Sequence, residues 1–217
     1  MTSIISKNRA ALLTCIASIG ITGCSIFGIN NVEEAAHSIA IADGDYELRN
    51  YEPVVVATTE VNADFDEAGK IAFRRLFGYI SGNNVAREEI SMTSPVLSES
   101  DDSANGEKIQ MTAPVLGEPT AAGWTYSFVL PSSYTIETAP QPLLNEVTLA
   151  AIPEKQVAVL KYKGLQSESK MQDNLRKLEE WIGSNNLAPA SAPRWAGYNP
   201  PFTIPFLRRN EVMIDVE

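Results

Sequence analysis

The chain is poor in the side chains that carry most enzymatic and metal chemistry. Its 217 residues include only two cysteines and one histidine, His37. A catalytic Ser-His-Asp set or a histidine-based metal cluster needs imidazole beside other ligands or nucleophiles, so these classes of site have little support. The sequence also lacks a glycine-rich loop of the phosphate-binding type. We therefore expect a protein that is not an enzyme.

Positive charge is scarce as well. Lysine and arginine number 17 against 27 aspartates and glutamates, which gives a formal net charge of −10. Nucleic acids and anionic lipid surfaces both select proteins with a basic footprint, so we expect no nucleic-acid partner and no electrostatic docking on lipid. A small ligand is not excluded. With 44% hydrophobic and 20% charged residues, the composition is that of one globular domain with a sizeable core.

The N-terminal apolar run is too short to cross a bilayer. It covers residues 10–21, whereas a spanning helix needs about 20 residues. Lys7 and Arg9 precede it, and Ile21-Thr22-Gly23-Cys24 follows, which resembles the lipobox of bacterial lipoproteins. This resemblance implies that residues 1–23 are a signal peptide, removed before Cys24, and that Cys24 is acylated. The alternative is an ordinary secretion signal with an incidental cysteine.

Acylation of Cys24 would give the protein a membrane anchor. Ser25 follows it, and a residue other than Asp there is consistent with sorting to the outer membrane, so we expect a lipid-anchored protein on the periplasmic face of that membrane. Cys15 leaves with the signal peptide. The mature domain then has no free thiol, and so no disulfide and no thiolate ligand for a metal or haem.

Residues 24–43 are predicted to form a tether, with a short helix around Val32–Ala42. His37 lies in this stretch and is expected to be exposed to solvent. The folded domain is predicted to occupy residues 44–217.

Residues from Tyr46 onward follow strand and helix patterns. Tyr46–Tyr51 alternates, and Pro53–Val61 is rich in β-branched residues, so both predict strands. Asp64 followed by Glu67 has the pattern of a capping box, and apolar residues then recur at helical spacing. The run Gly82-Asn83-Asn84 is predicted to end this helix.

The pattern I-x-M-T-x-P-V occurs twice, at Ile90–Val96 and Ile109–Val115. In each copy the alternate residues share one face, and the polar stretch 98–108 lies between the copies. We therefore predict two paired strands of a hairpin, with the Ile and Met side chains facing inward and each proline at an edge, a bulge or a strand end. Met in such a stripe is more often core filler than an iron ligand.

The second half of the chain repeats the plan of the first. Strands are predicted at 124–130, 146–152, 156–162, 194–198 and 211–216, and a helix at 167–182. The order β-β-α-β-β is thus followed by β-β-β-α-β-β. We expect one α+β domain of two similar halves, each with a helix over a mainly antiparallel sheet.

Taken together, these segments and several short sequence blocks resemble the SOUL/haem-binding protein family. The resemblance implies a distorted antiparallel β-barrel of two pseudo-symmetric halves, each carrying one helix. The matching blocks are Tyr46-Glu47-Leu48-Arg49 with Tyr51-Glu52-Pro53, Phe73 to Gly82 with Asn83, both M-T-x-P-V segments, Ser127 to Pro131, and Tyr198-Asn199-Pro200-Pro201 with Arg208 to Val212.

The family resemblance also implies a ligand, haem or another tetrapyrrole. A porphyrin has a flat apolar face and two propionates, which suit an apolar groove with cations at its rim. The resemblance places the ligand on the helix predicted after Asp64. The alternative is that half of the apolar residues of that helix bury against the sheet and that its arginines are only solvated. The residues that the resemblance assigns are Phe73, Leu76, Phe77, Tyr79 and Ile80 for the macrocycle, and Arg74 or Arg75 for the propionates.

The iron of haem has no obvious partner, because the predicted domain 44–217 contains no histidine. Some family members are described with an axial histidine, so the chain departs from the family there. We expect the domain to bind haem weakly, through the flat face of the porphyrin, whether or not the porphyrin holds a metal. The alternative is a protein that binds another hydrophobic molecule or a protein partner, with haem binding incidental.

Overall fold

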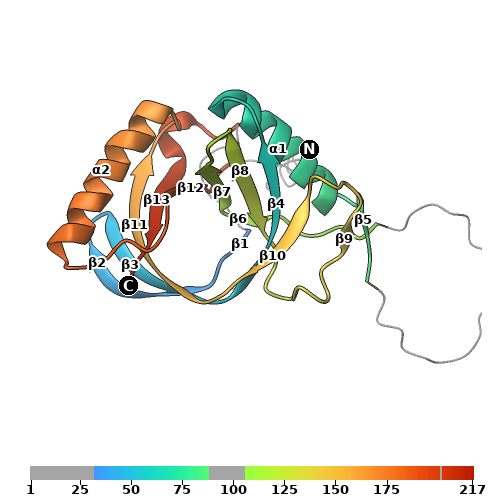
Figure 1. Ribbon diagram of the computed structural model, residues 1–217, viewed down its shortest axis with the longest axis horizontal. Coiled ribbons are helices and arrows are strands. Elements are labelled where there is room, and N and C mark those ends of the chain that lie inside the picture. The colour runs from blue at the N-terminus through green and yellow to red at the C-terminus, as the bar shows by residue number, and fades with distance from the viewer. Residues whose placement is uncertain (1–31, 88–105, 201) are drawn as a thin grey trace, which may run out of the picture.

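The computed structural model describes residues 32–87, 106–200 and 202–217, and in these it has an α+β architecture. Nine antiparallel strands form one sheet that curls into a half-barrel, and two helices cover it (Figure 1). This confirms the distorted antiparallel barrel with two helices that the sequence predicts. The predicted signal peptide, Cys24 and the first I-x-M-T-x-P-V copy lie outside the described residues.

The first part of the fold contains β1 (Glu33–Glu34), β2 (His37–Asp43), β3 (Tyr46–Tyr51), β4 (Val54–Val61), α1 (Phe65–Ile80), β5 (Asn84–Val85), β6 (Thr112–Ala113), β7 (Val115–Pro119) and β8 (Trp124–Val129). The second part contains β9 (Gln141–Pro142), β10 (Thr148–Ile152), β11 (Lys155–Lys163), α2 (Glu168–Ser184), β12 (Arg194–Gly197), the 3-10 turn η1 (Pro205–Leu207) and β13 (Arg209–Asp215). The strands of the large sheet lie in the order β10-β4-β8-β7-β12-β13-β11-β3-β2.

This order shows the internal duplication directly. In the first half, β4 is followed by α1, β7 and β8, and β8 lies between β4 and β7. In the second half, β11 is followed by α2, β12 and β13, and β13 lies between β11 and β12. The two units meet where β7 pairs with β12. They also exchange a strand, because β3 pairs with β11 of the second unit and β10 pairs with β4 of the first.

Helix α1 forms where the capping pattern predicts it. The Asp64 carboxylate accepts a hydrogen bond from the Glu67 N–H at 2.9 Å, which satisfies one free donor of the first turn. The helix ends at Ile80 with Ser81 as its C-cap, and Gly82 follows with a φ of +118°, a conformation that favours glycine. No helix among the described residues has the length and apolar character that a membrane span needs.

The short helix predicted around Val32–Ala42 is wrong. Residues 37–43 form β2, which pairs with β3 at the edge of the sheet, and Glu33–Glu34 pairs with β6. The residues of β2 are almost all exposed, and its apolar residues 39–42 follow one another directly, so the sequence lacks the apolar–polar alternation that would reveal a strand. His37 is half-buried rather than fully exposed: its ring lies 4.9 Å from that of Tyr51.

The second I-x-M-T-x-P-V copy is only partly a strand. Ile109 is buried under α1, as predicted, but Met111 is 42% exposed, so the expectation that it faces inward is wrong. The reason is that regular pairing begins only at Thr112, and residues 109–111 do not follow the strand alternation. Pro114 separates β6 from β7, which confirms the predicted strand end at this proline. The predicted hairpin partner lies in the stretch that the structure does not describe.

The sheet buries apolar side chains on both faces. Both helices pack on one face, α1 over β4 and β8, and α2 over β11 and β13. On the other face, side chains from β4, β11 and β13 meet in one apolar cluster, which includes Val56, Val159 and Met213. Since β8, β7 and β12 lie between β4 and β13 in the sheet, their side chains can meet only if the face without helices is the concave inside of the half-barrel.

The concave face also holds a buried ion cluster, centred on Glu211 of β13. The Arg49 guanidinium donates two hydrogen bonds to the Glu211 carboxylate, at 2.9 and 3.0 Å. The Tyr198 hydroxyl donates to the same carboxylate at 2.7 Å, and Arg209 does so at 2.8 Å. Arg49 is 1% exposed and Glu211 is fully buried. Each formal charge therefore has a partner, which a buried ion requires.

The electrostatics of the cluster favour its charged form. Burial alone would raise the pKa of the Glu211 carboxyl, but the hydrogen bonds and charge of Arg49 hold that pKa below its ordinary value of 4.5. Burial and the facing Glu211 raise the pKa of Tyr198 well above 10, so its hydroxyl remains a donor. The family-like blocks around Glu47–Tyr51 and Arg208–Val212 thus have a structural role in this cluster.

We expect the substitution Glu211→Gln to lower the free energy of unfolding by about 3–5 kcal/mol at neutral pH, because it removes the carboxylate that Arg49 and Arg209 share and leaves Glu47 as the remaining carboxylate partner of buried Arg49. The contribution of Glu211 is complete above its ordinary pKa of 4.5 and is lost as the pH falls through the lower folded-state pKa. The deficit of the variant should therefore shrink in acid. Urea unfolding followed by circular dichroism across this pH range measures both effects.

The matched control is Asp173→Asn, which removes an exposed carboxylate from its ion pair with Arg176 on α2. This pair is well solvated, so the control should change the unfolding free energy by less than about 1 kcal/mol. Equal stability of Glu211→Gln and the control would contradict the structural role of the cluster.

Candidate functional site

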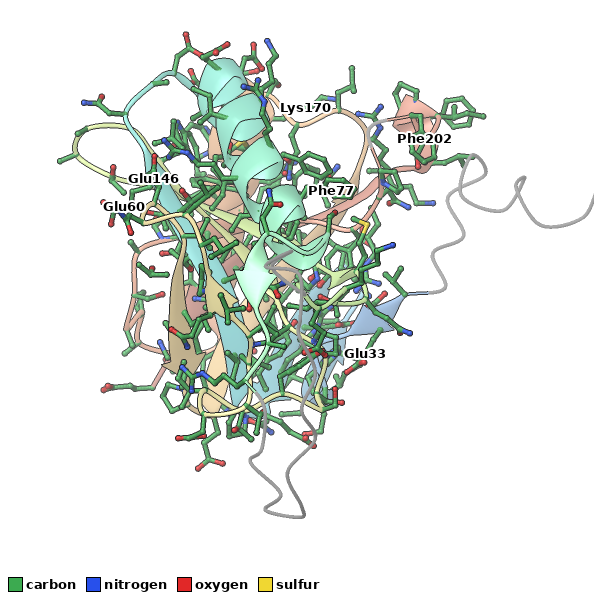
Figure 2. The ribbon with its side chains drawn as sticks, turned by 90° about the vertical axis from the view of Figure 1, so that its right-hand side faces the viewer. Glu33, Glu60, Phe77, Glu146, Lys170 and Phe202 are labelled. Atoms are coloured by element: carbon green, nitrogen blue, oxygen red, sulfur yellow. The ribbon has the colours of Figure 1, made fainter. Side chains whose placement is uncertain are left out.

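The seven site residues predicted on α1 fall on two different sides of the helix. Leu76, Tyr79 and Ile80 are at most 4% exposed and pack against the sheet. Phe73 and Phe77 are 40% and 45% exposed and lie on the outer side, where Figure 2 shows Phe77. The structure therefore divides the predicted set into residues that fix the helix and residues that a ligand could reach.

Phe73 and Phe77 form an exposed aromatic pair, one helical turn apart. Their ring centroids are 5.6 Å apart and their planes differ by 12°, so the rings are stacked. The ring of Phe73 also meets Phe128 of β8 edge-on, with 5.8 Å between the ring centroids and 63° between the planes. The contact with Phe128 holds the pair against the sheet, while a large part of both rings stays in solvent. Such a surface can accept a flat apolar molecule.

The two predicted arginines differ in availability. Arg75 donates to the Thr59 hydroxyl at 3.3 Å and to the Glu60 carbonyl at 3.1 Å, and it lies 3.6 Å from the Glu146 carboxylate. Arg74 is exposed and makes no ion pair with the residues that the structure describes. Arg74 is therefore the arginine that a ligand carboxylate could engage without breaking existing contacts.

Lys70 joins this surface, although the predicted site did not include it. It lies three residues before Phe73 and seven before Phe77, which places it on the same side of the helix. Among the described residues its one ion pair is a 4.0 Å contact with Glu67, and both side chains are more than half exposed. The exposed surface of α1, defined as Lys70, Phe73, Arg74 and Phe77, thus combines two rings with two available cations.

The buried residues of α1 connect the helix to the long loop between β8 and β9, residues 130–140. The Tyr79 hydroxyl donates to the Pro140 carbonyl at 2.9 Å, and burial raises the pKa of this tyrosine beyond its ordinary value. Tyr134 and Ile136 of the same loop pack on the cluster that contains Leu76 and Tyr79. These contacts position the helix and the loop together.

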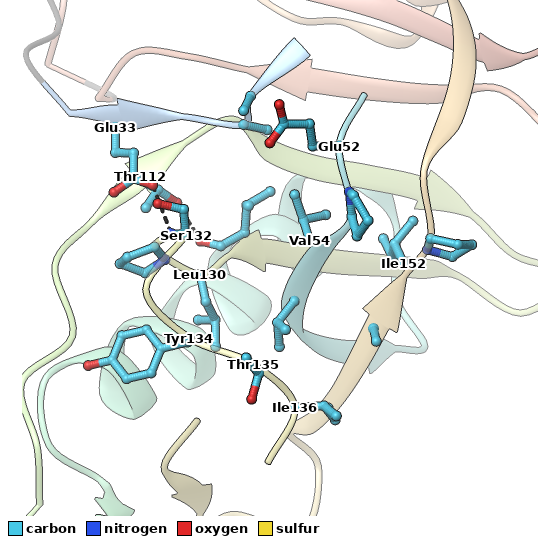
Figure 3. A pocket seen from close by; sticks show the side chains of 18 of the residues that line it. Glu33, Glu52, Val54, Thr112, Leu130, Ser132, Tyr134, Thr135, Ile136 and Ile152 are labelled. Carbon is cyan, nitrogen blue, oxygen red and sulfur yellow. Dashed lines mark hydrogen bonds between the residues drawn. The ribbon is translucent and has the colours of Figure 1, made fainter. Parts of the chain in front are cut away.

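That loop also forms one wall of a cavity of about 510 Å³ at one end of the half-barrel (Figure 3). The other walls come from the start of β4, the end of β8, the end of β10 and the segment 33–36. None of the seven predicted site residues lines it. Its walls are assembled from segments far apart in the chain, so no local sequence pattern could have revealed it.

The described residues contain no group of three or more histidine, cysteine, aspartate or glutamate side chains arranged to hold a metal ion. His37 lies on β2, where its Nδ1 atom is 3.0 Å from the Ala35 carbonyl oxygen. The helix α1 carries no histidine. A haem on the exposed surface of α1 would therefore meet aromatic rings and cations, and not an imidazole from that helix.

Comparison with known proteins gives a family and a fold. The sequence model described as SOUL heme-binding protein matches residues 32–215. Human "Heme-binding protein 2" is 30% identical over 173 residues, which cover 79% of this chain and 78% of the human protein. Xenopus laevis "Heme-binding protein 1" is 29% identical over 187 residues, 85% of this chain and 91% of the relative. The family match begins before β2, inside the predicted tether.

Among solved structures, the C-terminal domain of EcmrR superposes with a TM-score of 0.53. It is 11% identical and covers 79% of this chain and 96% of that domain. At this identity the similarity concerns the fold alone.

We expect substitutions on the two sides of α1 to have different effects on stability. Leu76→Ala should lower the free energy of unfolding by about 2–5 kcal/mol, because it leaves a cavity in a fully buried cluster. Phe77→Ala should cost less than about 1.5 kcal/mol, since its ring is 45% exposed and chiefly stacks on Phe73. Urea unfolding of the two variants tests this; similar losses would mean that Phe77 is a core residue.

Proposed function

The chain belongs to the SOUL heme-binding protein family, and on that basis we propose that it binds haem and related porphyrins non-covalently on the exposed surface of α1. We further propose that it does so as a lipid-anchored protein of the bacterial cell envelope, for buffering, carriage or sensing of the ligand. The family is a haem-binding family and not an enzyme family, and the proposed role needs no catalytic step.

The observation that carries the proposal is the stacked, exposed pair of Phe73 and Phe77. A porphyrin is a rigid aromatic plane, and it can cover such a pair without ordering many rotatable bonds. Lys70 and Arg74 lie beside the rings and can approach the two propionates at the edge of the macrocycle. The geometry thus supplies an apolar support and two charges of the correct sign.

The cavity at the end of the half-barrel suits a porphyrin less well. Glu33, Glu34, Glu52 and Glu137 line it, and no lysine, arginine or histidine is among the described residues that do. The propionates of a porphyrin would face carboxylates there, and like charges in a partly apolar site repel each other. This comparison favours the surface of α1.

Haem bound on α1 would supply a planar, redox-capable iron macrocycle. The residues of the helix would hold its face and its propionates, and no imidazole of α1 is available to the iron. We therefore propose that haem and metal-free porphyrin bind with similar affinity. Burying ~300 Å² of apolar porphyrin surface contributes ~7 kcal/mol before the costs of association, so we expect micromolar binding.

We expect haemin and metal-free protoporphyrin IX to bind the domain with dissociation constants within about threefold of each other, since the porphyrin face provides most of the interaction. The double variant Phe73→Ala/Phe77→Ala should weaken both about tenfold or more. Arg74→Gln should weaken both about threefold, as expected for a solvated charge pair. The Soret band for haemin and the fluorescence of protoporphyrin report the binding.

The matched control is Ile39→Ala/Ile41→Ala, which removes two exposed apolar side chains from β2, at the edge of the sheet far from β4 and α1. It should leave both affinities unchanged. Equal losses in the control and the phenylalanine variant would show non-specific adsorption, and no binding of either porphyrin by the unaltered chain would refute the proposed function.

The anchoring part of the proposal rests on the N-terminal sequence, residues 1–25, with Cys24 as the acylated residue. We expect the full-length chain, expressed in a bacterium with a lipoprotein pathway, to incorporate labelled palmitate and to fractionate with membranes. Cys24→Ser should abolish the labelling because it removes the acylated thiol. Cys15→Ser is the matched control and should not. Labelling that survives Cys24→Ser would contradict the assignment.

A further inference from the structure

The charged side chains that line the cavity at the end of the half-barrel are acidic, whereas those on the exposed surface of α1 are basic. We propose that this cavity is a separate binding site for lipophilic organic cations, of the class of aryl phosphonium and quaternary ammonium ions. The inference rests on the lining of the cavity alone and does not depend on the proposed binding of porphyrins.

The walls of the cavity select an apolar ligand. Val54 and Val55 from β4, Leu130 after β8 and Ile152 from β10 line it, and Ile136 closes it from the loop. Tyr134 contributes an aromatic ring, which can attract a cation through its π-electrons. The volume of about 510 Å³ is within the usual range for small-molecule sites.

The charges around the cavity select a positive ligand. Four of its lining residues are glutamates, and none of the described lining residues is basic. Two arginines lie nearby without lining it. Arg209 pairs with Glu34 at 3.0 Å, and Arg87 donates to the Glu137 carbonyl at 2.5 Å and to the Ile136 carbonyl. Glu33 and Glu52 make no ion pair with the residues that the structure describes.

Glu33 is held at the edge of the cavity by the fold. Its carboxylate accepts a hydrogen bond from the Ser132 N–H at 2.7 Å, a contact between residues 99 positions apart (Figure 3). This hydrogen bond lowers the pKa of Glu33, so the carboxylate is ionised at neutral pH. A fixed negative charge beside an apolar wall costs no reorganisation when a cation arrives.

Other ligand classes fit the cavity less well. An organic anion would meet the carboxylates of Glu33 and Glu52, which have no ion pair with the described residues, and a neutral apolar molecule would gain nothing from them. A bare metal ion would need several carboxylates converging on one point, and no such group occurs among the described residues. A bulky cation with apolar substituents uses both properties of the cavity, because its shell contacts the walls while its diffuse charge is attracted over several ångströms.

Tetraphenylphosphonium and tetraphenylborate provide the test, because they have nearly the same size and shape and opposite charge. We expect isothermal titration of the purified domain to give a dissociation constant in the range of about 10–100 micromolar for the phosphonium ion. Tetraphenylborate should bind at least about tenfold more weakly, because its charge has the sign of the carboxylates. Equal affinities for the two ions, or no binding of the phosphonium ion, would overturn the inference.

Two variants locate the site. Glu52→Gln/Glu137→Gln removes two charges from the lining and should weaken phosphonium binding about tenfold. Ala151→Trp narrows the cavity at constant charge and should weaken it by a similar factor, because Ala151 lines the cavity from the end of β10. The control Glu118→Gln/Glu180→Gln removes two exposed glutamates from β7 and α2, outside the cavity, and should leave the affinity unchanged.

The result for phosphonium binding can be separated from the porphyrin proposal by testing each variant with both ligands. Glu52→Gln/Glu137→Gln should bind protoporphyrin as the unaltered chain does, and Phe73→Ala/Phe77→Ala should bind the phosphonium ion normally. Loss of phosphonium binding in the phenylalanine variant would place that ion on α1 and overturn the inference. Porphyrin binding without phosphonium binding would refute the cavity site and leave the proposed function standing.

Discussion

The fold depends on a buried carboxylate that is shared by distant parts of the chain. Glu211 lies on β13, its partner Tyr198 directly follows the neighbouring strand β12, and its partner Arg49 lies on β3, beyond β11 on the other side. Arg209 connects the same carboxylate to Glu34 of β1, whose strand pairs with β6. Because a buried charge is costly without its partners, the cluster favours one arrangement of these strands over others. The concave face can then be partly polar without leaving its charges unpaired.

The regular elements could be predicted from the sequence because their signals are local. The capping pattern of Asp64 and Glu67 fixed the start of α1, and the run of β-branched residues at 53–61 gave β4. The edge strand β2 gave no such signal, since a strand that buries almost nothing needs no apolar alternation. The prediction that Met111 faces inward failed for the converse reason. Residues 109–111 have the alternating sequence of a strand, but they are not paired with another strand in the structure.

The site could be predicted only in part. The sequence identified α1 as the ligand-facing helix by resemblance, but it could not separate Leu76 and Tyr79, which the core requires, from Phe73 and Phe77, which remain accessible. Helical spacing places all four within one broad apolar surface, and only the packing of α1 on β4 and β8 decides which part of it is covered. The cavity depends on contacts between segments about 100 residues apart, such as Glu33 with Ser132, which no spacing rule describes.

The exchange of β3 and β10 between the two halves has a consequence for biogenesis. Strand β13 lies in the interior of the sheet, between β11 and β12, yet it is the last of the nine strands to emerge during synthesis. The pairing of the second half cannot be completed before then, and β3 must wait for a partner more than 100 residues downstream. A nascent chain of this topology therefore cannot complete its sheet until translation has passed β13. Such a delay would be compatible with the export in an unfolded state that the proposed envelope location requires.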